Sequence, residues 1–497
     1  MKSTREWSDP AEADLERLPP AEVFKAGERN HHISNTAYPI AHEQTWAPYR
    51  TQRVEHEKAS RAAFADVDDL CLYVHIPFCE VRCAFCEYTV VSGTDLDRTA
   101  VYRDALLTEI DRWGALLDSD ARTRNIKGVD IGGGTPSFIP AADITSIVER
   151  LRDRFNVDKA GFSIETTPRI AATEPDKLKA YVACGMERIS MGVQVIQPDL
   201  LKILARDANG VEHHHRAVEH IRAAGFRRLN LDVMYGFADQ SEESLSATLR
   251  HCIALDPEYI TLYRMRYKLT RISHQAPRVT AQHAKVHAAL ARSVLEEAGY
   301  EANPGKNTFV HRRVKAARPF DVGTSDYLTE RVIQGTPYLG LGLGAQTFTH
   351  TTISYNDGSV GKNLLPYLRS VDAGRLPIQD LYVLPQAHMM AKFVAVAFYF
   401  GEIDRRAFAA KFGQTLEQAF PDEVNFVKAQ GLMHETSGQY GTSEALSLTP
   451  SGAGHFAGVI ALFFAPSVQR YLVNSDPDTA TDMDVARTKA LRLSQKQ

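Results

Sequence analysis

From residue 71 onward, short apolar runs alternate with longer amphipathic segments, and this alternation constrains the fold more than any other feature. The apolar runs span residues 72–76, 128–131, 162–165, 188–192, 229–234 and 259–262. Helical patterns occupy residues 99–117, 141–155, 176–184, 210–224 and 241–255 between them. Strands and helices that alternate in this way form a parallel sheet with right-handed crossovers. Six units are fewer than the eight of a closed barrel, so we expect an α/β fold with a partial, open (β/α)6 barrel.

The remaining sequence predicts further regions around the barrel. After residue 380, three helical segments (residues 386–400, 404–412 and 421–430) precede two short strands and a last helix, an order that resembles a winged-helix module. Residues 340–345 read as a tight passage from a strand into a loop. We therefore expect four regions: an N-terminal extension at 1–70, the barrel domain with an extension at 71–380, a mainly helical C-terminal domain at 381–475 and a disordered polar tail at 476–497.

Charge and hydropathy exclude several classes of function. The chain has 57 Lys and Arg against 61 Asp and Glu, a net charge of −4, and this balance argues against nucleic-acid binding. No apolar run approaches the ~18 residues of a membrane span, and the polar N-terminus lacks the apolar core of a signal peptide. We therefore expect a cytoplasmic monomer that acts on a small-molecule substrate.

Three of the six cysteines lie close together, directly after the first expected strand. Cys79, Cys83 and Cys86 have the spacing C-x3-C-x2-C. Thiolates ligate iron–sulfur clusters, and three ligands for the four irons of a cubane leave one iron open to bind substrate. The sequence therefore predicts a [4Fe–4S] cluster on these residues. The alternative is a structural zinc site completed by His75, but zinc motifs usually add a second cysteine pair, which this sequence lacks.

Other cysteine and histidine residues fit structural roles better than metal binding. We expect Cys184 and Cys252 to pack as small apolar residues, which leaves no carrier thiol and no ligands for an auxiliary cluster. Consecutive histidines at 213–215 point in different directions on a helix, so we expect a solvated helix face there.

Polar or glycine residues stand at the ends of successive predicted strands. A Gly-Gly-Gly-Thr-Pro sequence at residues 132–136 follows the second strand, and glycines let the backbone approach a ligand closely. Glu165 ends the third strand, Gln194 follows the fourth and Asp232 ends the fifth. Parallel barrels gather their chemistry at this edge, so we expect the site there.

These motifs together resemble the oxygen-independent coproporphyrinogen III oxidase (HemN-like) family of radical S-adenosylmethionine (SAM) proteins. The resemblance runs from Ser34-Asn-Thr-Ala-Tyr-Pro through Tyr-Val-His-Ile-Pro-Phe-Cys, Gly-Gly-Gly-Thr-Pro-Ser, Ser-Ile-Glu, Ser-Met-Gly-Val-Gln and Asp-Val-Met-Tyr-Gly to Thr449-Pro-Ser-Gly, and omits both tails and residues 264–335. It implies a radical SAM barrel with one [4Fe–4S] cluster, two SAM molecules and an electron donor such as flavodoxin or ferredoxin.

The resemblance also implies ligands for each SAM molecule. The first SAM binds the open iron and is cleaved to methionine and a 5′-deoxyadenosyl radical; Tyr73, Gly133 and Glu165 match positions that contact it. Positions that match the surroundings of the second SAM are Phe85, Gly134, Thr135, Gln194, Arg206 and Asp232. Gln346 is a further position that we expect to bind cofactor.

Departures from the oxidase pattern affect the substrate side. Tyr88 stands where oxidases carry a further cysteine, and Arg266 replaces a small residue at the second SAM site. Residues 306–331 also differ around the substrate channel, and the HNxxYW-like signature of the haem-chaperone branch is absent. This pattern favours the methylating branch (class C) of antibiotic and other natural-product pathways, in which a SAM-derived methylene adds to an unsaturated carbon. Tyr88 and Arg266 are then the candidate catalytic residues.

Other functions remain as hypotheses: a porphyrinogen-decarboxylating oxidase, a different radical reaction, or a non-catalytic haem carrier. Cobalamin-dependent methylation is excluded, because the 70 residues before the first strand are fewer than the ~100 of a typical domain. Arg264, Arg266 and Lys268 alternate like strand residues on one face, and they suit either a carboxylate of SAM or substrate or a salt-bridged rim. Whether a partner methyltransferase completes the reaction stays open.

Overall fold

The computed structural model describes residues 12–31, 33–40, 42–92, 96–118, 123–267, 270–439 and 444–475. The predicted disordered tail and Lys268 lie outside the described residues. Every described helix is too short or too polar to cross a lipid bilayer.

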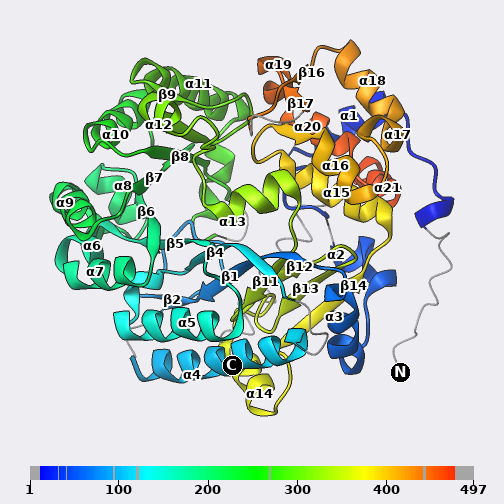
Figure 1. Ribbon diagram of the computed structural model, residues 1–497. Helices are drawn as coiled ribbons and strands as arrows, with labels where there is room; N and C mark the ends of the chain where they lie inside the picture. Colours follow the sequence, from blue (N-terminus) through cyan, green and yellow to red (C-terminus); the bar gives the residue numbers. More distant parts are fainter. Residues whose placement is uncertain are drawn as a thin grey trace.

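A twelve-stranded mixed sheet forms the centre of the molecule (Figure 1). Its six middle strands run parallel in chain order and confirm the predicted βα units. They are β1 (Asp69–Ile76), β4 (Asn125–Gly133), β5 (Gly161–Thr166), β6 (Met186–Gln194), β7 (Arg228–Tyr235) and β8 (Tyr259–Arg264). The strand order is linear, with β14 at one edge and β9 at the other, so the barrel is open as expected.

Helices cover the outer face of the parallel strands, on the cyan-to-green side of Figure 1. They are α4 (Leu96–Asp118), α5 (Ala141–Arg154), α6 (Pro168–Thr173), α7 (Pro175–Ala183), α8 (Pro198–Ile203), α9 (His214–Ala224) and α10 (Glu242–Ala254). The largest apolar core lies between these helices and the sheet, and it contains strand residues such as Val129, Ile131 and Ile189. Cys184 and Cys252 are buried in it, as predicted for small apolar side chains.

Residues 281–383, for which the sequence predicted few elements, add strands to both edges of the sheet. On one side, α11 (Ala281–Glu297) leads to β9 (Tyr300–Glu301) and β10 (Thr308–His311), which pairs antiparallel with β8. On the other side, β11 (Tyr338–Leu341) pairs parallel with β1 and is followed by β12 (Gln346–Phe348), β13 (Thr352–Asn356) and β14 (Ile378–Val383). The predicted tight passage is present, because Gly342 and Gly344 have φ of 98° and 66°.

Between these edges, α12 (Arg312–Ala317) leads to the short helix α13 (Asp326–Thr329), which continues into a π-helical turn, η8 (Glu330–Gln334). The backbone of α13 lies against the first halves of β4 and β5. A Cβ atom at Gly128 would lie 2.2 Å from the amide nitrogen of Tyr327. Because Gly128 has no side chain, α13 can lie across the end of the barrel where the parallel strands begin.

The C-terminal region is mainly helical, as expected, with a small antiparallel sheet. The three predicted helices correspond to α15 (Gln386–Ala397), α16 (Arg405–Phe412) and α18 (Pro421–Ala429), and a short α17 (Leu416–Ala419) lies between the last two. The sheet has the order β15 (Glu402–Asp404), β17 (Ala445–Leu448) and β16 (Met433–Thr436), one strand more than predicted. The expected last helix is divided into α19 (Pro450–Gly454), α20 (Phe456–Leu462) and α21 (Pro466–Asn474). The winged-helix resemblance stays a prediction.

The N-terminal residues pack against the C-terminal helices. Helix α1 (Pro20–Arg29) crosses α20 so closely that a Cβ atom at Gly27 would lie 2.5 Å from the carbonyl oxygen of Ala457. Val23 and Trp46 share an apolar core with Leu462 and its neighbours. Figure 1 shows this contact as blue α1 among the orange and red helices.

Candidate functional site at the inner face of the barrel

The inner face of the parallel strands is lined with polar side chains at alternate strand positions. Successive strand residues point to opposite faces, so the apolar residues that pack under the helices leave their neighbours inside the barrel. Hydrogen bonds link this set: Asn230 Nδ2 donates to Ser190 Oγ (2.7 Å), and Thr261 Oγ1 donates to Asn230 Oδ1 (2.8 Å). The inward residues include Asp130, Ser163, Glu165, Arg188, Ser190, Asn230, Asp232 and Thr261.

The three predicted cluster cysteines are half-buried and follow β1. Cys79 ends the short strand β2 (Phe78–Cys79), and Cys83 and Cys86 lie in the loop after it; we call this segment the cysteine loop. Thr135 Oγ1 donates a hydrogen bond to Cys79 Sγ (3.5 Å), and Arg206 Nη1 donates one to Cys83 Sγ (3.4 Å). Burial raises the pKa of Cys79 to about 12, and the charges of Cys83 and Cys86 add to this rise, so the three thiols are close enough to interact. Without a bound cation, the Cys79 thiol stays protonated at neutral pH.

The donor set fits an iron–sulfur cluster better than a preformed ion site. No three His, Cys, Asp or Glu side chains in the described ranges are already arranged around one metal ion. However, thiolates are the usual ligands of such clusters, and hydrogen bonds to sulfur tune them. Gly134 also keeps space open: a Cβ atom there would lie 3.0 Å from Cys79 Sγ. The loop can therefore hold a [4Fe–4S] cluster on Cys79, Cys83 and Cys86.

The glycine sequence after β4 joins the cysteine loop to the barrel interior. The amide of Gly134 donates a hydrogen bond to the carbonyl oxygen of Ile76, and that of Thr135 donates one to the carbonyl oxygen of Phe78; both distances are 2.8 Å. Gly133 has φ of 119°, a conformation that favours glycine, and a Cβ atom there would lie 2.6 Å from the His75 ring.

Glycine at 132 also brings two predicted SAM contacts together. A Cβ atom at Gly132 would lie 2.9 Å from Glu165 Oε1 and 3.4 Å from Tyr73 Cε2. Tyr73 and Glu165 therefore flank the same stretch of open backbone, as the predicted binding site for the first SAM requires.

Three carboxyl groups inside the barrel have raised pKa values. Burial is the main cause, and it raises the pKa of Glu165 to about 8 and those of Asp130 and Asp232 to about 6. Repulsion from the two aspartates raises that of Glu165 further, whereas Arg188 opposes the rise. The Glu165 side chain lies deep in the protein yet is accessible, so it faces a cavity inside the barrel. At pH 7 its carboxyl group is mostly protonated and can donate a hydrogen bond.

Two buried polar atoms near the cysteine loop, Gln194 Oε1 and Arg206 Nε, have no hydrogen-bond partner. Arg188 Nε and Asp130 Oδ1 also lack a partner, but these two residues contact the segment that leads into α13. Buried polar atoms are normally satisfied, and Gln194 also has a left-handed φ of 67°, a rare conformation for a residue other than glycine. Unsatisfied donors and acceptors beside the cysteine loop suit a polar ligand such as SAM.

Tyrosines form another wall of the cavity. Tyr88, Tyr263 and Tyr399 are 67%, 43% and 39% exposed. Surrounding protein atoms nevertheless raise the pKa of Tyr88, with Glu165 and Tyr399 adding to the effect, so Tyr88 lies near both groups. We call this space, lined by Tyr88, Tyr263, Tyr399 and Glu165, the tyrosine chamber.

The remaining predicted residues have mixed surroundings. Arg266 Nη2 forms an ion pair with Glu87 Oε2 (2.6 Å) and therefore already has an anionic partner. Phe85 packs in an apolar cluster with Leu200 and Leu204. Gln346 lies on β12, where its Oε1 accepts a hydrogen bond from Tyr338.

One expectation about the histidines was wrong. His214 is buried rather than solvated, because it begins α9 against α10, with its Nδ1 2.9 Å from His251 Nε2.

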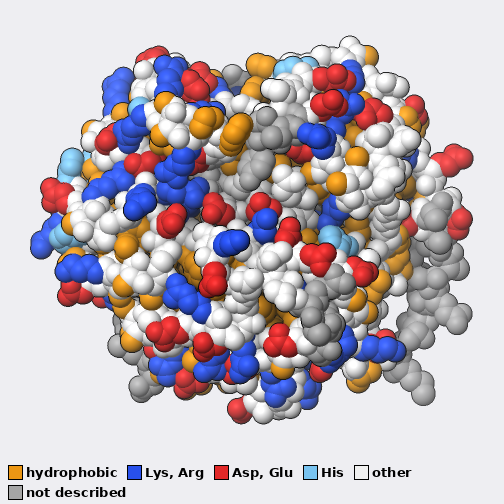
Figure 2. Space-filling view, viewed as in Figure 1, with side chains coloured by type: hydrophobic (Ala, Val, Ile, Leu, Met, Phe, Trp, Pro, Cys, Tyr) orange, Lys and Arg blue, Asp and Glu red, His pale blue; other side chains and the backbone are white. Residues whose placement is uncertain are grey.

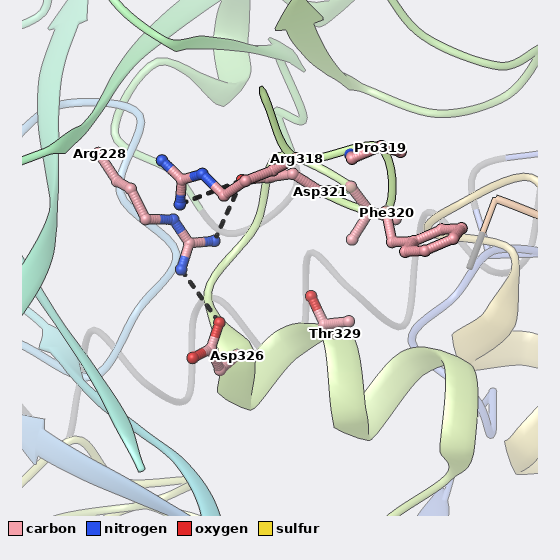
Figure 3. Close-up of a pocket in the computed structure, with 8 residues that line it drawn as sticks. Arg228, Arg318, Pro319, Phe320, Asp321, Asp326 and Thr329 are labelled. Atoms are coloured by element: carbon pink, nitrogen blue, oxygen red, sulfur yellow. Dashed lines mark hydrogen bonds and ion pairs between the residues drawn. The ribbon is translucent and has the colours of Figure 1, made fainter. Parts of the chain in front are cut away.

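A pocket of about 380 Å³ lies at the opposite end of the barrel, where Arg228 begins β7. Arg228 forms an ion pair with Asp326 (3.0 Å) and lies 4.0 Å from Asp321, which Arg318 also approaches (Figure 3). Its charges are thus paired within the protein. On the face of the molecule that Figure 2 shows, acidic and basic side chains are mixed.

Sequence reasoning missed Asp130, Arg188, Tyr327, Arg331 and Tyr399. A signal existed for the first two, because polar residues alternate with apolar ones in β4 and β6. The others come from segments without strong periodicity, and only tertiary packing brings them to the barrel.

Comparison with known proteins finds similarity to the radical SAM superfamily in the barrel region. A family model described as the radical SAM superfamily matches residues 73–252. The oxygen-independent coproporphyrinogen III oxidase of Salmonella typhimurium is 33% identical over 207 residues, which are 41% of this chain and 44% of that protein. The match therefore spans less than half the length of that relative.

Two longer likenesses extend beyond the barrel. The heme chaperone HemW of Bacillus subtilis is 24% identical over 398 residues, covering 78% of this chain and 98% of that protein. Coproporphyrinogen III oxidase (HemN) from Escherichia coli has a solved structure that matches with a TM-score of 0.69 and 23% identity, over 86% of this chain and 96% of that one. This last likeness shows the fold alone, while the family model shows that residues 73–252 are similar to the radical SAM superfamily.

Proposed function

We propose that this chain is a radical SAM enzyme that acts on a small molecule in the tyrosine chamber. When bound, a [4Fe–4S] cluster and SAM supply a 5′-deoxyadenosyl radical, which abstracts hydrogen. The observation that carries the proposal is the contact of the cysteine loop with the polar barrel interior, through Thr135 and Arg206. An external electron donor such as flavodoxin or ferredoxin belongs to the proposal.

The chain's own residues have separable roles in this proposal. Cys79, Cys83 and Cys86 hold the cluster, and the Arg206 and Thr135 side chains stabilise negative charge on the first two sulfurs. Glu165, protonated at neutral pH, can donate to or accept from SAM beside the open backbone at Gly132.

Oxidative decarboxylation of a porphyrinogen is one candidate for the overall reaction. Its support is the similarity to coproporphyrinogen III oxidases in sequence and fold. The matched residues include the cysteine loop and the strand ends, which serve radical formation in either candidate, so the similarity does not test the substrate.

Methylation or cyclopropanation of an unsaturated carbon is the second candidate. Its support is Tyr88, which faces the tyrosine chamber. The oxidase pattern has a cysteine at this position. This reaction needs a second SAM with its methyl group held beside the radical carbon. Unpartnered Gln194 Oε1 and Arg206 Nε could bind that second SAM, whereas Arg266 would first have to leave Glu87.

Deuterium transfer distinguishes the two reactions without knowledge of the acceptor. The reconstituted enzyme is incubated anaerobically with reductant and SAM that carries a trideuterated methyl group, with and without coproporphyrinogen III. Carbon transfer predicts deuterium in 5′-deoxyadenosine, because the radical takes hydrogen from the methyl group of the second SAM. Oxidation predicts undeuterated 5′-deoxyadenosine together with protoporphyrinogen. The Cys83→Ala variant is the control, and failure of the unmodified enzyme to cleave SAM would contradict the whole proposal.

A further inference from the structure

Arg331 is a half-buried cation without an acidic partner. Within the described part of the chain, no carboxylate lies within ion-pair distance of its guanidinium, and its one hydrogen bond runs from Nη1 to Tyr327 Oη at 3.5 Å. Its Nε atom is buried with no partner. The guanidinium lies over the Tyr338 ring, 4.5 Å from the ring centroid. Cation–π contact supplies some stabilisation, but it leaves the edge of the guanidinium without acceptors.

The nearby acidic groups are engaged elsewhere. Glu330, the neighbouring residue, accepts a hydrogen bond from Thr336 (3.1 Å), and Asp130 accepts one from Ser325 (2.7 Å). By contrast, buried Arg228 is paired with an aspartate at 3.0 Å. The groups that most raise the pKa of Arg331 are the phenols Tyr338, Tyr327 and Tyr399. A half-buried charge without a counter-ion is less favourable than a paired one, so the site is left open to an anion from outside the chain.

The backbone under Arg331 is also unusual. Arg331 lies in the π-helical turn η8, directly after α13. Such turns are rare, and they occur frequently at functional sites because they redirect side chains from the regular helical spacing. Here the turn directs Arg331 towards the Tyr327 and Tyr338 rings.

A continuous path of aromatic side chains leads from Arg331 to the proposed SAM site. The Tyr327 and Tyr338 ring centroids lie 5.9 Å apart, and those of Tyr327 and Tyr73 lie 6.0 Å apart. On another side, Tyr399 interacts electrostatically with both Arg331 and Tyr88. A group bound at Arg331 would therefore lie near Tyr399 of the tyrosine chamber and near Tyr73 of the proposed SAM site.

We propose that Arg331 binds a carboxylate group of the substrate and thereby orients the substrate in the tyrosine chamber. This inference rests on the proposed function, because it assigns the substrate class of that same chamber. A carboxylate matches the planar guanidinium edge, which can donate from Nε and Nη in parallel. Lys392, the other cation nearby, donates to the carbonyl oxygen of Tyr38 (2.9 Å) instead.

Benzoate and benzamide provide probes that need no knowledge of the natural substrate. Both are small and aromatic, but only benzoate carries the carboxylate. Equilibrium dialysis of radiolabelled probe against the reconstituted, SAM-loaded full chain gives Kd directly. We expect saturable benzoate binding that weakens at least about tenfold in Arg331→Gln, with Arg331→Lys retaining part of the affinity. Arg312→Gln is the matched control, because Arg312 is paired with Glu301 at the surface.

Three results would overturn the inference: no saturable benzoate binding, equal binding of benzamide, or equal affinity in Arg331→Gln and the unmodified chain. Thermal unfolding supplies a second test. Because Arg331 lacks a counter-ion, Arg331→Met should leave the melting temperature unchanged or raise it, whereas a fall of more than about 5 °C would assign Arg331 a structural role instead. Radical formation is measured separately as SAM cleavage, so loss of cleavage in the unmodified enzyme contradicts the proposed function and leaves the binding result to stand alone.

Discussion

Arg206 donates a hydrogen bond from Nη1 to the sulfur of Cys83 over 3.4 Å, and its Nη2 donates to the carbonyl oxygen of Gly192. One guanidinium thus connects the cysteine loop to the last residues of β6. Sequence resemblance places Arg206 near a second SAM, and the structure adds contact with a predicted cluster ligand. Arg206 can therefore act on the cluster or on the second SAM. Measuring the reduction potential of the cluster and the rate of product formation separates the two roles.

The first prediction concerns the electronic effect of Arg206. Arg206→Ala removes a positive charge and a hydrogen bond from Cys83 Sγ, and both stabilise the reduced cluster. We expect a more negative reduction potential and slower SAM cleavage, measured by redox titration of the EPR signal and by 5′-deoxyadenosine formation. Arg216→Ala, at an exposed position in α9, is the control. An unchanged potential with impaired product formation would restrict Arg206 to the second SAM.

The second prediction tests the cluster ligands. Cys83→Ala removes one of three thiolates, so we expect loss of iron and no detectable SAM cleavage after anaerobic reconstitution. Cys252→Ala is the matched control, since Cys252 is fully buried in α10 away from the cysteine loop. Iron and sulfide analysis with UV-visible spectroscopy provides the measurement. A full cluster content in Cys83→Ala would refute the assignment.

The third prediction is a pH dependence of stability in the SAM-free chain. The pKa of Glu165 is about 8 in the folded protein, above its ordinary value of 4.5, so between these values the folded state binds more protons than the unfolded state. Stability from this group is present at low pH and is lost as pH rises towards 8. The contributions of Asp130 and Asp232 are likewise present at low pH and are lost as pH rises towards about 6.

Glu165→Gln should therefore reduce the fall in melting temperature between pH 6 and 8, whereas Glu187→Gln, at an exposed position of β6, should not. Scanning calorimetry at matched ionic strength provides the measurement. If the two variants and the unmodified chain show parallel slopes, Glu165 does not titrate in this range.

The sequence alone predicted the six βα units, because the spacing of apolar runs directly reflects strands that pack under helices. It also located the strand-end residues Glu165, Gln194 and Asp232. It missed the polar inner surface, since Asp130 and Arg188 lie within runs read as apolar. Arg331 was beyond reach for a different reason: its position depends on a π-helical turn and on tyrosines more than 60 residues apart in sequence, such as Tyr327 and Tyr399.

The last prediction concerns Arg266, which the sequence analysis proposed either as a ligand for a carboxylate or as part of a salt-bridged rim. Its ion pair with Glu87 supports a different role, in which Arg266 positions the residues next to Cys86 and Tyr88. The pair is partly exposed, so removing it should change the free energy of unfolding by only about 0–1 kcal/mol.

If Arg266 acts only through Glu87, then Arg266→Gln, Glu87→Gln and the double variant should impair product formation equally, because each removes the same ion pair. If Arg266 binds SAM directly, Glu87→Gln should free the guanidinium and impair the reaction less than Arg266→Gln. Deuterium transfer from the methyl group of SAM to 5′-deoxyadenosine is the readout, normalised to total SAM cleavage. We expect equal impairment in the three variants, since the guanidinium already has its carboxylate partner at 2.6 Å.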